Sequence, residues 1–233
     1  MSYKELFHTC SARWRRAVLL GGLCALLSLG VVAWAGVDLD RMLVSMRERY
    51  GSAGEQSLRD WRDMLQGAGN LSEADKLRRV NDFFNRRIRF LDDIVVWRVA
   101  DYWATPIEFL GQGAGDCEDY AIAKLHSLLE LGVAPERLRM IYVRATLGSS
   151  GSPVQVAHMV LGYYAAPDAE PLVLDNLITD IRPASRRPDL APVFSFNREG
   201  VFMGGATRPT SPVDRLSLWA GLKSKMRAEG YEP

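Results

Sequence analysis

Cysteine is scarce in this chain of 233 residues, which contains three. Two of them, Cys10 and Cys24, precede residue 36, so Cys117 is alone in the rest of the chain. A framework of intramolecular disulfides, the usual support of small exported domains, is therefore excluded for residues 36–233. The roles left for Cys117 are pairing between molecules, an inert buried thiol or a reactive thiol.

The chain also lacks a strong net charge, internal repeats and low-complexity tracts. Its 29 basic and 28 acidic residues are interleaved, so the sequence shows none of the basic faces with which domains bind nucleic acids. The glycines at 111, 113 and 115 are not followed by the Gly-Lys-Ser/Thr of a phosphate-binding loop. The length and the 48% hydrophobic content fit one domain with one ordinary core.

One long apolar run lies near the N-terminus. Residues 17–35 carry no charge and follow arginines at 13, 15 and 16, which is the layout of an export signal. The run ends in Ala33-Trp34-Ala35, which a signal peptidase could cleave, but it is also long enough for an uncleaved membrane anchor. In both cases the arginines place the rest of the chain outside the cytoplasm. We expect a signal or anchor over 1–35 and a single domain over 36–233, with membrane contact only through an uncleaved segment.

The periodicity of apolar residues predicts helices first and strands afterwards. Helices are expected over 37–49, 55–65, 72–87, from the residues after 115 to about 132, and over 213–228, the last with Leu216, Trp219 and Ala220 on its apolar face. Strands are expected over 139–145, 154–164, 171–175, 191–196 and 201–203. This order predicts an α+β fold in which helices are followed by an antiparallel sheet.

Cys117 lies in the first turn of the helix predicted after the glycine-rich segment. The unpaired backbone N–H groups and the positive end of the helix dipole favour a thiolate there, and the thiolate is the nucleophilic form of cysteine. The carboxylates of Asp116, Glu118 and Asp119 oppose this effect, because nearby negative charge raises the pKa of a thiol. Two roles are open to them: capping the helix, or binding Ca²⁺, which takes about six to eight oxygen ligands.

His158 and Asp175 are the candidates for a base and its orienting residue. A histidine in the middle of a strand is commonly a hydrogen-bonded core residue, and an aspartate after a strand is commonly a turn residue. His126 competes for the role of base, but it lies nine residues beyond Cys117 on the same helix, which is out of direct reach. If the strand before Asp175 pairs with the strand that contains His158, the Asp175 carboxylate could reach the second ring nitrogen of His158.

Three stretches share a pattern with a known family: WATPxEFLxxGxGDCEDYA over 103–121, HMVL over 158–161 and LVLDN over 172–176. The chain resembles the bacterial transglutaminase-like cysteine proteases of the LapG type, over roughly residues 77–197. The resemblance implies a papain-like/transglutaminase core with the nucleophile at a helix N-terminus, and a catalytic triad of Cys117, His158 and Asp175. It also implies a Ca²⁺ requirement, with ligands falling on Asp116, Glu118 and Asp119 and, further upstream, on Asp101.

The resemblance carries further expectations about biology. Proteases of this type are periplasmic and cut a large surface adhesin near its N-terminus, after paired alanines, which releases the adhesin and disperses a biofilm. An inner-membrane receptor of the LapD type holds them inactive when cyclic di-GMP is high, and the nucleotide binds the receptor rather than the protease. A periplasmic location agrees with the export signal.

The expected reaction is acyl transfer to water. The Cys117 thiolate would attack the scissile carbonyl, His158 would protonate the leaving amine, and water would then hydrolyse the thioester with His158 as base. The backbone N–H of Cys117 is the expected oxyanion donor, and Gln112 and Trp103 are candidates for a second. Two alternatives stay open: a transglutaminase, which passes the acyl group to an amine, and an inactive binding module with a structural thiol.

Overall fold

The computed structural model describes residues 39–148, 153–204 and 206–230. All of them fall in one unit of the chain, residues 36–233. The signal or anchor expected over 1–35 lies outside the described residues. Within the described ranges, no helix is both long enough and apolar enough to cross a membrane.

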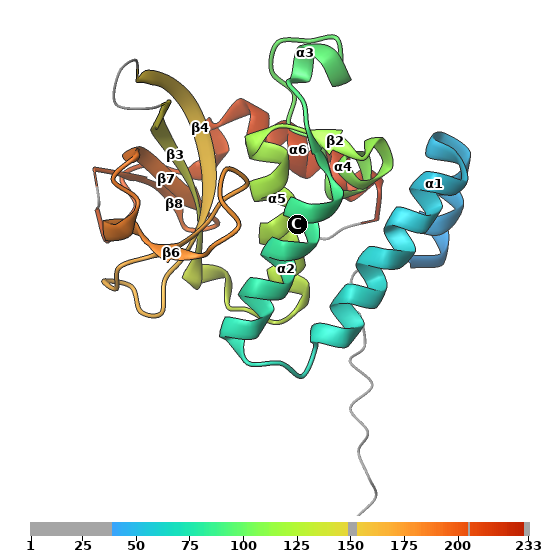
Figure 1. Ribbon diagram of the computed structural model, residues 1–233, viewed down its shortest axis with the longest axis horizontal. Helices are drawn as coiled ribbons and strands as arrows, with labels where there is room; N and C mark the ends of the chain where they lie inside the picture. Colours follow the sequence, from blue (N-terminus) through green and yellow to red (C-terminus); the bar gives the residue numbers. More distant parts are fainter. Residues whose placement is uncertain (1–38, 149–152, 205, 231–233) are drawn as a thin grey trace, which may run out of the picture. The chain divides into compact units, whose positions relative to one another are not determined.

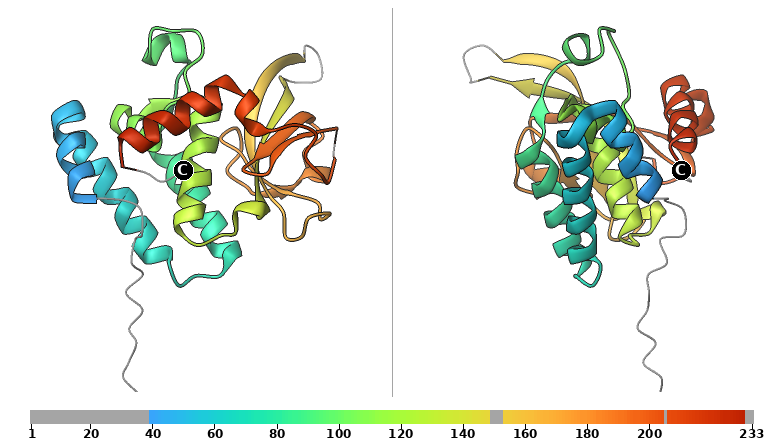
Figure 2. Two further views of the ribbon diagram at one scale, coloured as in Figure 1. Left: turned by 180° about the vertical axis from the view of Figure 1, so that it is seen from behind. Right: turned by 90° about the vertical axis from the view of Figure 1, so that its right-hand side faces the viewer.

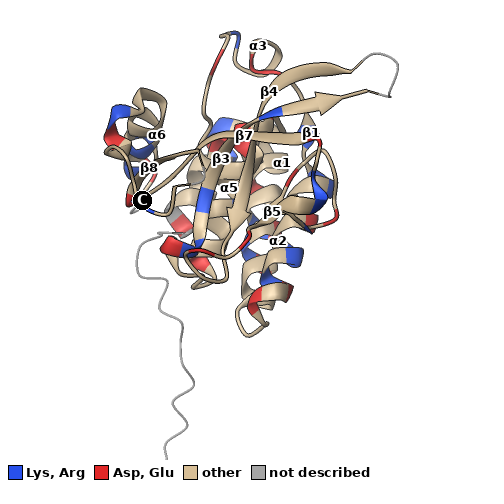
Figure 3. Ribbon diagram, turned by 90° about the vertical axis from the view of Figure 1, so that its left-hand side faces the viewer, with Lys and Arg blue, Asp and Glu red and all other residues tan. Residues whose placement is uncertain are grey.

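The first helices confirm those expected over 37–49, 55–65 and 72–87. Helix α1 (Leu39–Ala68) is interrupted at Gly51, whose φ of 69° lies in the left-handed region that favours glycine. The two expected helices are therefore present, but one residue separates them. Helix α2 (Glu73–Arg87) begins after Ser72, whose side chain accepts the Asp75 N–H. Acidic and basic residues both occur along α2, as Figure 3 shows.

The sequence predicted neither a helix nor a strand between α2 and α5 (Cys117–Glu130), and the structure corrects this. The segment contains strand β1 (Arg89–Phe90), the short helix α3 (Asp93–Val96), helix α4 (Pro106–Gln112) and strand β2 (Ala114–Gly115). Strands β1 and β2 pair in parallel. Helix α4 forms because Thr105 and Glu108 make a reciprocal capping box, and it ends at Gly113 with a φ of 61°.

The sheet has six strands in the order β6-β5-β4-β3-β7-β8, and every neighbouring pair is antiparallel. The strands are β3 (Leu138–Leu147), β4 (Val154–Tyr163), β5 (Leu172–Leu174), β6 (Arg182–Pro183), β7 (Leu190–Asn197) and β8 (Gly200–Met203). The α+β prediction is confirmed, and β6 is the strand that the sequence reading missed.

Helix α5 connects the helices to the sheet, because it packs against β4 and β3 and also contacts α2 and α4 (Figure 1). A buried hydrogen bond of 2.8 Å from Trp61 Nε1 to Ser127 Oγ joins α1 to α5. After the sheet, the 3-10 turn η3 (Val213–Arg215) leads into α6 (Ser217–Ala228), which returns to the helices (Figure 2). Its Lys225 donates to the Trp103 carbonyl over 2.6 Å. Trp219 lies on the buried face of α6 as expected, but Leu222 and Met226 complete this face in place of Leu216 and Ala220.

The contact between α1 and α4 requires a glycine. A Cβ added to Gly111 would lie 2.3 Å from Cδ2 of the Tyr50 ring, whereas a Cβ on Gly221 of α6 would meet no atom within 4 Å. We predict that Gly111→Ala lowers the free energy of unfolding by about 1–3 kcal/mol. The matched change Gly221→Ala should raise it by about 0.5–1 kcal/mol, because alanine is the better helix former. Urea unfolding measures both, and equal stability of the two variants would contradict this packing.

Candidate active site

Cys117 is the first residue of α5 and is half-buried, so the predicted position at a helix start is confirmed. Asp116 occupies the N-cap position, but its side chain makes no capping hydrogen bond. The Asp116 side chain therefore does not cap the helix, but Asp119 accepts a hydrogen bond from the Asp116 backbone N–H, so the capping role expected of these acids is present in part.

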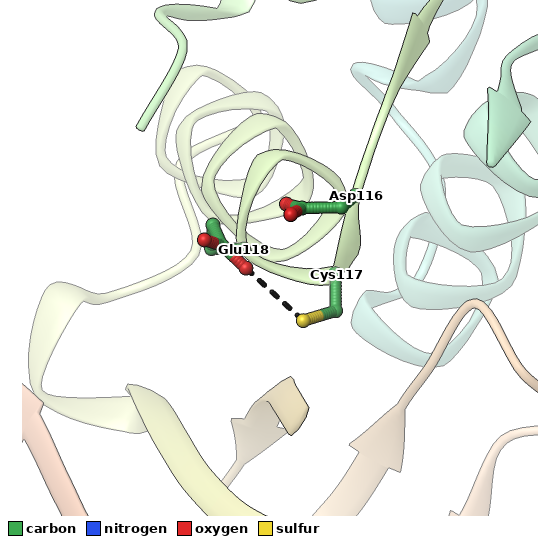
Figure 4. Close-up of side chains that lie close together, drawn as sticks. All are labelled: Asp116, Cys117 and Glu118. Atoms are coloured by element: carbon green, nitrogen blue, oxygen red, sulfur yellow. Dashed lines mark hydrogen bonds between the residues drawn. The ribbon is translucent and has the colours of Figure 1, made fainter. Parts of the chain in front are cut away.

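The environment of the thiol holds it protonated. Cys117 Sγ donates to Glu118 Oε2 over 3.0 Å, and Figure 4 shows the two side chains pointing toward one another. Burial raises the pKa of Cys117, and the charges of Glu118 and Asp116 raise it further, while a hydrogen bond from the Met159 backbone N–H lowers it. Burial is thus the largest cause of the raised pKa, and the effect expected of the neighbouring carboxylates adds to it.

His158 and Asp175 meet because β4 and β5 pair in the expected antiparallel way, with Leu161 opposite Leu174. The distance from His158 Nε2 to Asp175 Oδ1 is 2.8 Å, and both side chains are buried. The Leu177 N–H donates to the same carboxylate oxygen over 3.1 Å. Because Nε2 is engaged by Asp175, Nδ1 is the nitrogen left to exchange a proton with a thiol.

Cys117 and His158 line the same cavity, of about 510 Å³, and Asp175 lies behind His158. Trp103 also lines this cavity, whereas Gln112, the other candidate oxyanion donor, does not. The segment from η3 into α6 forms a wall that the sequence reading did not anticipate, with Arg215, Leu216, Ser217 and Leu218. We call this cavity the catalytic cleft. His126 lines a different cavity and burial lowers its pKa to about 3, so it stays out of the site as expected.

A cluster of carboxylates surrounds the start of α5. Carboxylate oxygens of Asp93, Asp116 and Asp119 lie within 4.8 Å of one another, and so do those of Asp93, Asp101 and Glu118. The four acids implicated by the resemblance are thus brought together. Asp93, which the sequence reading missed, belongs to both groups. It opens α3, far from the motif around Cys117, and no local pattern marks it.

The cluster has the chemistry of a site for a hard cation. Three of its oxygens, Asp93 Oδ1, Asp116 Oδ1 and Asp119 Oδ2, are buried without a hydrogen-bond partner. Burial raises the pKa of both Asp93 and Asp119, and the charge of Glu118 raises it further. Unpaired buried carboxylates are costly unless a cation or a proton neutralises them. An oxygen-only donor set suits Ca²⁺.

Gly115 makes room for this cluster, since a Cβ there would lie 2.3 Å from Asp119 Oδ2 and 2.7 Å from the Phe109 ring. Gly115 is the last glycine of the glycine-rich segment 111–115, which directly precedes Asp116 and Cys117. The structure specifies the purpose of this glycine, which is to admit a carboxylate.

The comparison with known families agrees with this geometry. Residues 60–188 match the family described as bacterial transglutaminase-like cysteine proteinase.

The chain belongs to the bacterial transglutaminase-like cysteine proteinases.

The solved structure of Legionella pneumophila LapG is similar to this proteinase with a TM-score of 0.69 and 32% sequence identity, covering 82% of this chain and 98% of that one. An EGTA-treated form of the same Legionella protein gives a TM-score of 0.71, and a calcium-bound form gives 0.68 at 33% identity. A search among curated proteins finds no match.

Arg187 is a further residue of the proteinase site that the sequence reading missed. Its Nη2 lies 2.7 Å from Asp175 Oδ2, and its guanidinium also binds Asp189. Burial by itself would raise the pKa of Asp175, but the contacts with His158, the Leu177 N–H and Arg187 lower it to about 2. Asp175 is therefore ionised throughout the range in which a protease works. Arg187 follows the 3-10 turn η2 (Ala184–Arg186) in an arginine-rich loop without periodicity, so no local signal distinguishes it.

We predict that Arg187→Met lowers the free energy of unfolding by about 3–5 kcal/mol, because it leaves a buried carboxylate short of a partner. The folded-state pKa of Asp175 lies below its unfolded value, so the stability that Asp175 contributes is present above the unfolded pKa and is lost as the pH falls toward about 2. Without Arg187 this loss should begin at a higher pH. Urea unfolding across the acid range measures both effects.

The control is the neighbouring Arg186→Met, which removes an exposed guanidinium and should change stability by less than about 0.5 kcal/mol. Equal losses for the two variants would show that Arg187 does not support Asp175.

Proposed function

We propose that this proteinase is a calcium-dependent endopeptidase with Cys117 as nucleophile, His158 as base and Asp175 as the orienting residue. The observation that carries the proposal is the 2.8 Å contact between His158 Nε2 and Asp175 Oδ1, made directly behind a cleft that Cys117 and His158 both line. A structural thiol in an inactive module would have no need of a buried, ionised carboxylate that fixes the tautomer of a neighbouring histidine.

The reaction follows from these positions. Asp175 holds the proton on Nε2 of His158, so Nδ1 takes the thiol proton from Cys117. The thiolate attacks the scissile carbonyl, and the imidazolium passes its proton to the leaving amine. Water then hydrolyses the thioester with His158 as base. The backbone N–H of Cys117 stabilises the oxyanion, and Trp103 is the better placed of the two candidates for a second donor, because it lines the cleft.

Ca²⁺ would be held by Asp93, Asp101, Asp116, Glu118 and Asp119. When bound, it would supply the positive charge that neutralises the carboxylates now raising the pKa of Cys117. The three buried oxygens without donors support this assignment. The existence of calcium-bound and EGTA-treated forms of the similar Legionella protein supports it too.

We further propose that the substrate is a large surface adhesin, cut near its N-terminus after paired alanines, so that the proteinase controls biofilm attachment. We place it in the periplasm, with an inner-membrane cyclic di-GMP receptor of the LapD type as its inhibitory partner. Membership of the family and the export-signal pattern over residues 1–35 support these assignments. Adding the exported domain of such a receptor to a cleavage assay should slow the reaction, and an unchanged rate would remove the receptor from the proposal.

The first functional prediction concerns the nucleophile. Cys117→Ala and Cys117→Ser should each lower cleavage of the N-terminal region of an adhesin from the same organism by about 10³-fold or more, because no other group can form the acyl-enzyme. Gel analysis and sequencing of the new ends measure the reaction. Ser224→Ala, at an exposed position of α6 outside the catalytic cleft, is the control and should leave the rate unchanged. Cleavage that survives loss of Cys117 would contradict the mechanism, and incorporation of a labelled amine into a glutamine donor would favour a transglutaminase.

The second functional prediction concerns the metal. EGTA should stop cleavage, and Ca²⁺ but not Mg²⁺ should restore it, because Mg²⁺ requires a smaller octahedral site. Asp93→Asn keeps the acceptor for the Tyr102 N–H but removes a charge, so it should raise the Ca²⁺ concentration for half-maximal activity about tenfold or more. Asp63→Asn, which removes an exposed carboxylate of α1 outside the cluster, is the control and should leave this concentration unchanged. Activity indifferent to EGTA would refute the calcium site.

A further inference from the structure

A second cavity, of about 290 Å³, opens on the sheet and shares only Phe194 with the catalytic cleft among the described residues. Its floor is apolar and consists of the buried residues Ile141, Val143, Val160 and Val173 from three adjacent strands. Its rim is exposed and includes Pro167, Asp168, Ala184 and Pro192. We call this cavity the sheet pocket. A hollow of this size over a buried aliphatic floor leaves apolar surface that a packed core would cover.

Arg139 provides a buried positive charge in the sheet pocket. Arg139 is 5% exposed. Its guanidinium carbon lies 3.8 Å from the centroid of the Phe202 ring and 4.6 Å from the centroid of the Tyr164 ring. Its Nε has no hydrogen-bond partner, and within the described part of the chain no carboxylate forms an ion pair with it. A guanidinium stays protonated in a protein, so burial cannot be relieved by loss of the proton. The aromatic faces offset only part of this cost.

Arg187 lines the same pocket and is also almost fully buried. Its Nε and Nη2 are occupied by Asp189 and Asp175, but its Nη1 has no hydrogen-bond partner. Asp168 is the acidic residue among those lining the pocket, and it lies on the exposed rim where water screens it. The pocket therefore presents the guanidinium of Arg139 without a carboxylate partner, one unused donor of the already paired Arg187, and one exposed carboxylate. This excess of positive charge in the sheet pocket favours the binding of an anion.

We propose that the sheet pocket binds a small free carboxylic acid with an apolar body of about ten carbon atoms, which matches a volume at the lower end of the range for small-molecule sites. The carboxylate would accept hydrogen bonds from Arg139, the cation without a counter-ion. The apolar body would cover the floor formed by Ile141, Val143, Val160 and Val173. A guanidinium recognises a carboxylate through paired N–H groups, which neither an alcohol nor an amine of the same length can satisfy.

The test is isothermal titration of the full chain with decanoate, decanol and decylammonium, in buffer with EGTA so that calcium soaps do not form. Decanoate should bind, decanol should bind at least about tenfold more weakly, and decylammonium should not bind. Arg139→Met keeps an unbranched side chain and removes the charge. It should lower the affinity for decanoate about tenfold or more and change the affinity for decanol by less than about twofold. Arg144→Met, an exposed arginine on the same strand and outside the pocket, should leave both affinities unchanged.

Three results would overturn the proposal: no binding of decanoate, equal binding of decanoate and decanol, or decanoate binding that survives Arg139→Met. If Arg139→Met does not fold, amide chemical shifts of the unaltered chain decide the question. Decanoate should then shift the signals of Val160, Val173 and Phe202, and shifts confined to residues outside the sheet pocket would refute the site.

Discussion

The concentration of negative charge at the start of α5 is the constraint on which the site depends. Burying several carboxylates together is unfavourable unless backbone donors, a proton or a cation satisfies them. The structure supplies some donors from the segment before α4, where the Tyr102 N–H binds Asp93 and the Ala104 N–H binds Asp119. That irregular segment is thereby held in place, and Trp103, which lies between these two donors, is positioned as a wall of the catalytic cleft.

A second buried charge, on Asp175, organises the other side of the cleft. Its carboxylate is bound by His158, by the Leu177 N–H and by Arg187, so strand, turn and loop converge on one group. Its backbone carbonyl accepts a hydrogen bond of 2.7 Å from Asn85 Nδ2 on α2, which ties the end of β5 to the helices. Several donors hold the Asp175 carboxylate in one orientation. The carboxylate in turn fixes the orientation of the His158 ring that it contacts.

The parts of the fold that the sequence predicted are those whose own periodicity is strong. Helix α5 and strands β3 and β4 carry apolar residues at regular spacing, so their burial could be read locally. Helix α4 was missed because Gly111 interrupts a short apolar run, although the Thr105 and Glu108 capping box was visible in the sequence. Asp93 and Arg187 could not be predicted, since each reaches its partners through tertiary contacts and neither lies in a recurring local pattern. His158 and Asp175 were identified by family resemblance, because each alone looks like an ordinary strand or turn residue.

In the proposed mechanism, the carboxylates around α5 and the carboxylate of Asp175 affect the transfer of one proton in opposite ways. Moving the thiol proton of Cys117 to His158 creates a thiolate and an imidazolium inside one cleft. The carboxylates around α5 disfavour the thiolate, because their charge raises the pKa of Cys117. Neutralising these carboxylates with a cation would remove the penalty on the thiolate. Asp175, kept ionised by its contacts with His158, the Leu177 N–H and Arg187, would continue to stabilise the imidazolium. The ion pair therefore needs both arrangements, a neutralised cluster on the thiol side and a permanently charged aspartate on the histidine side.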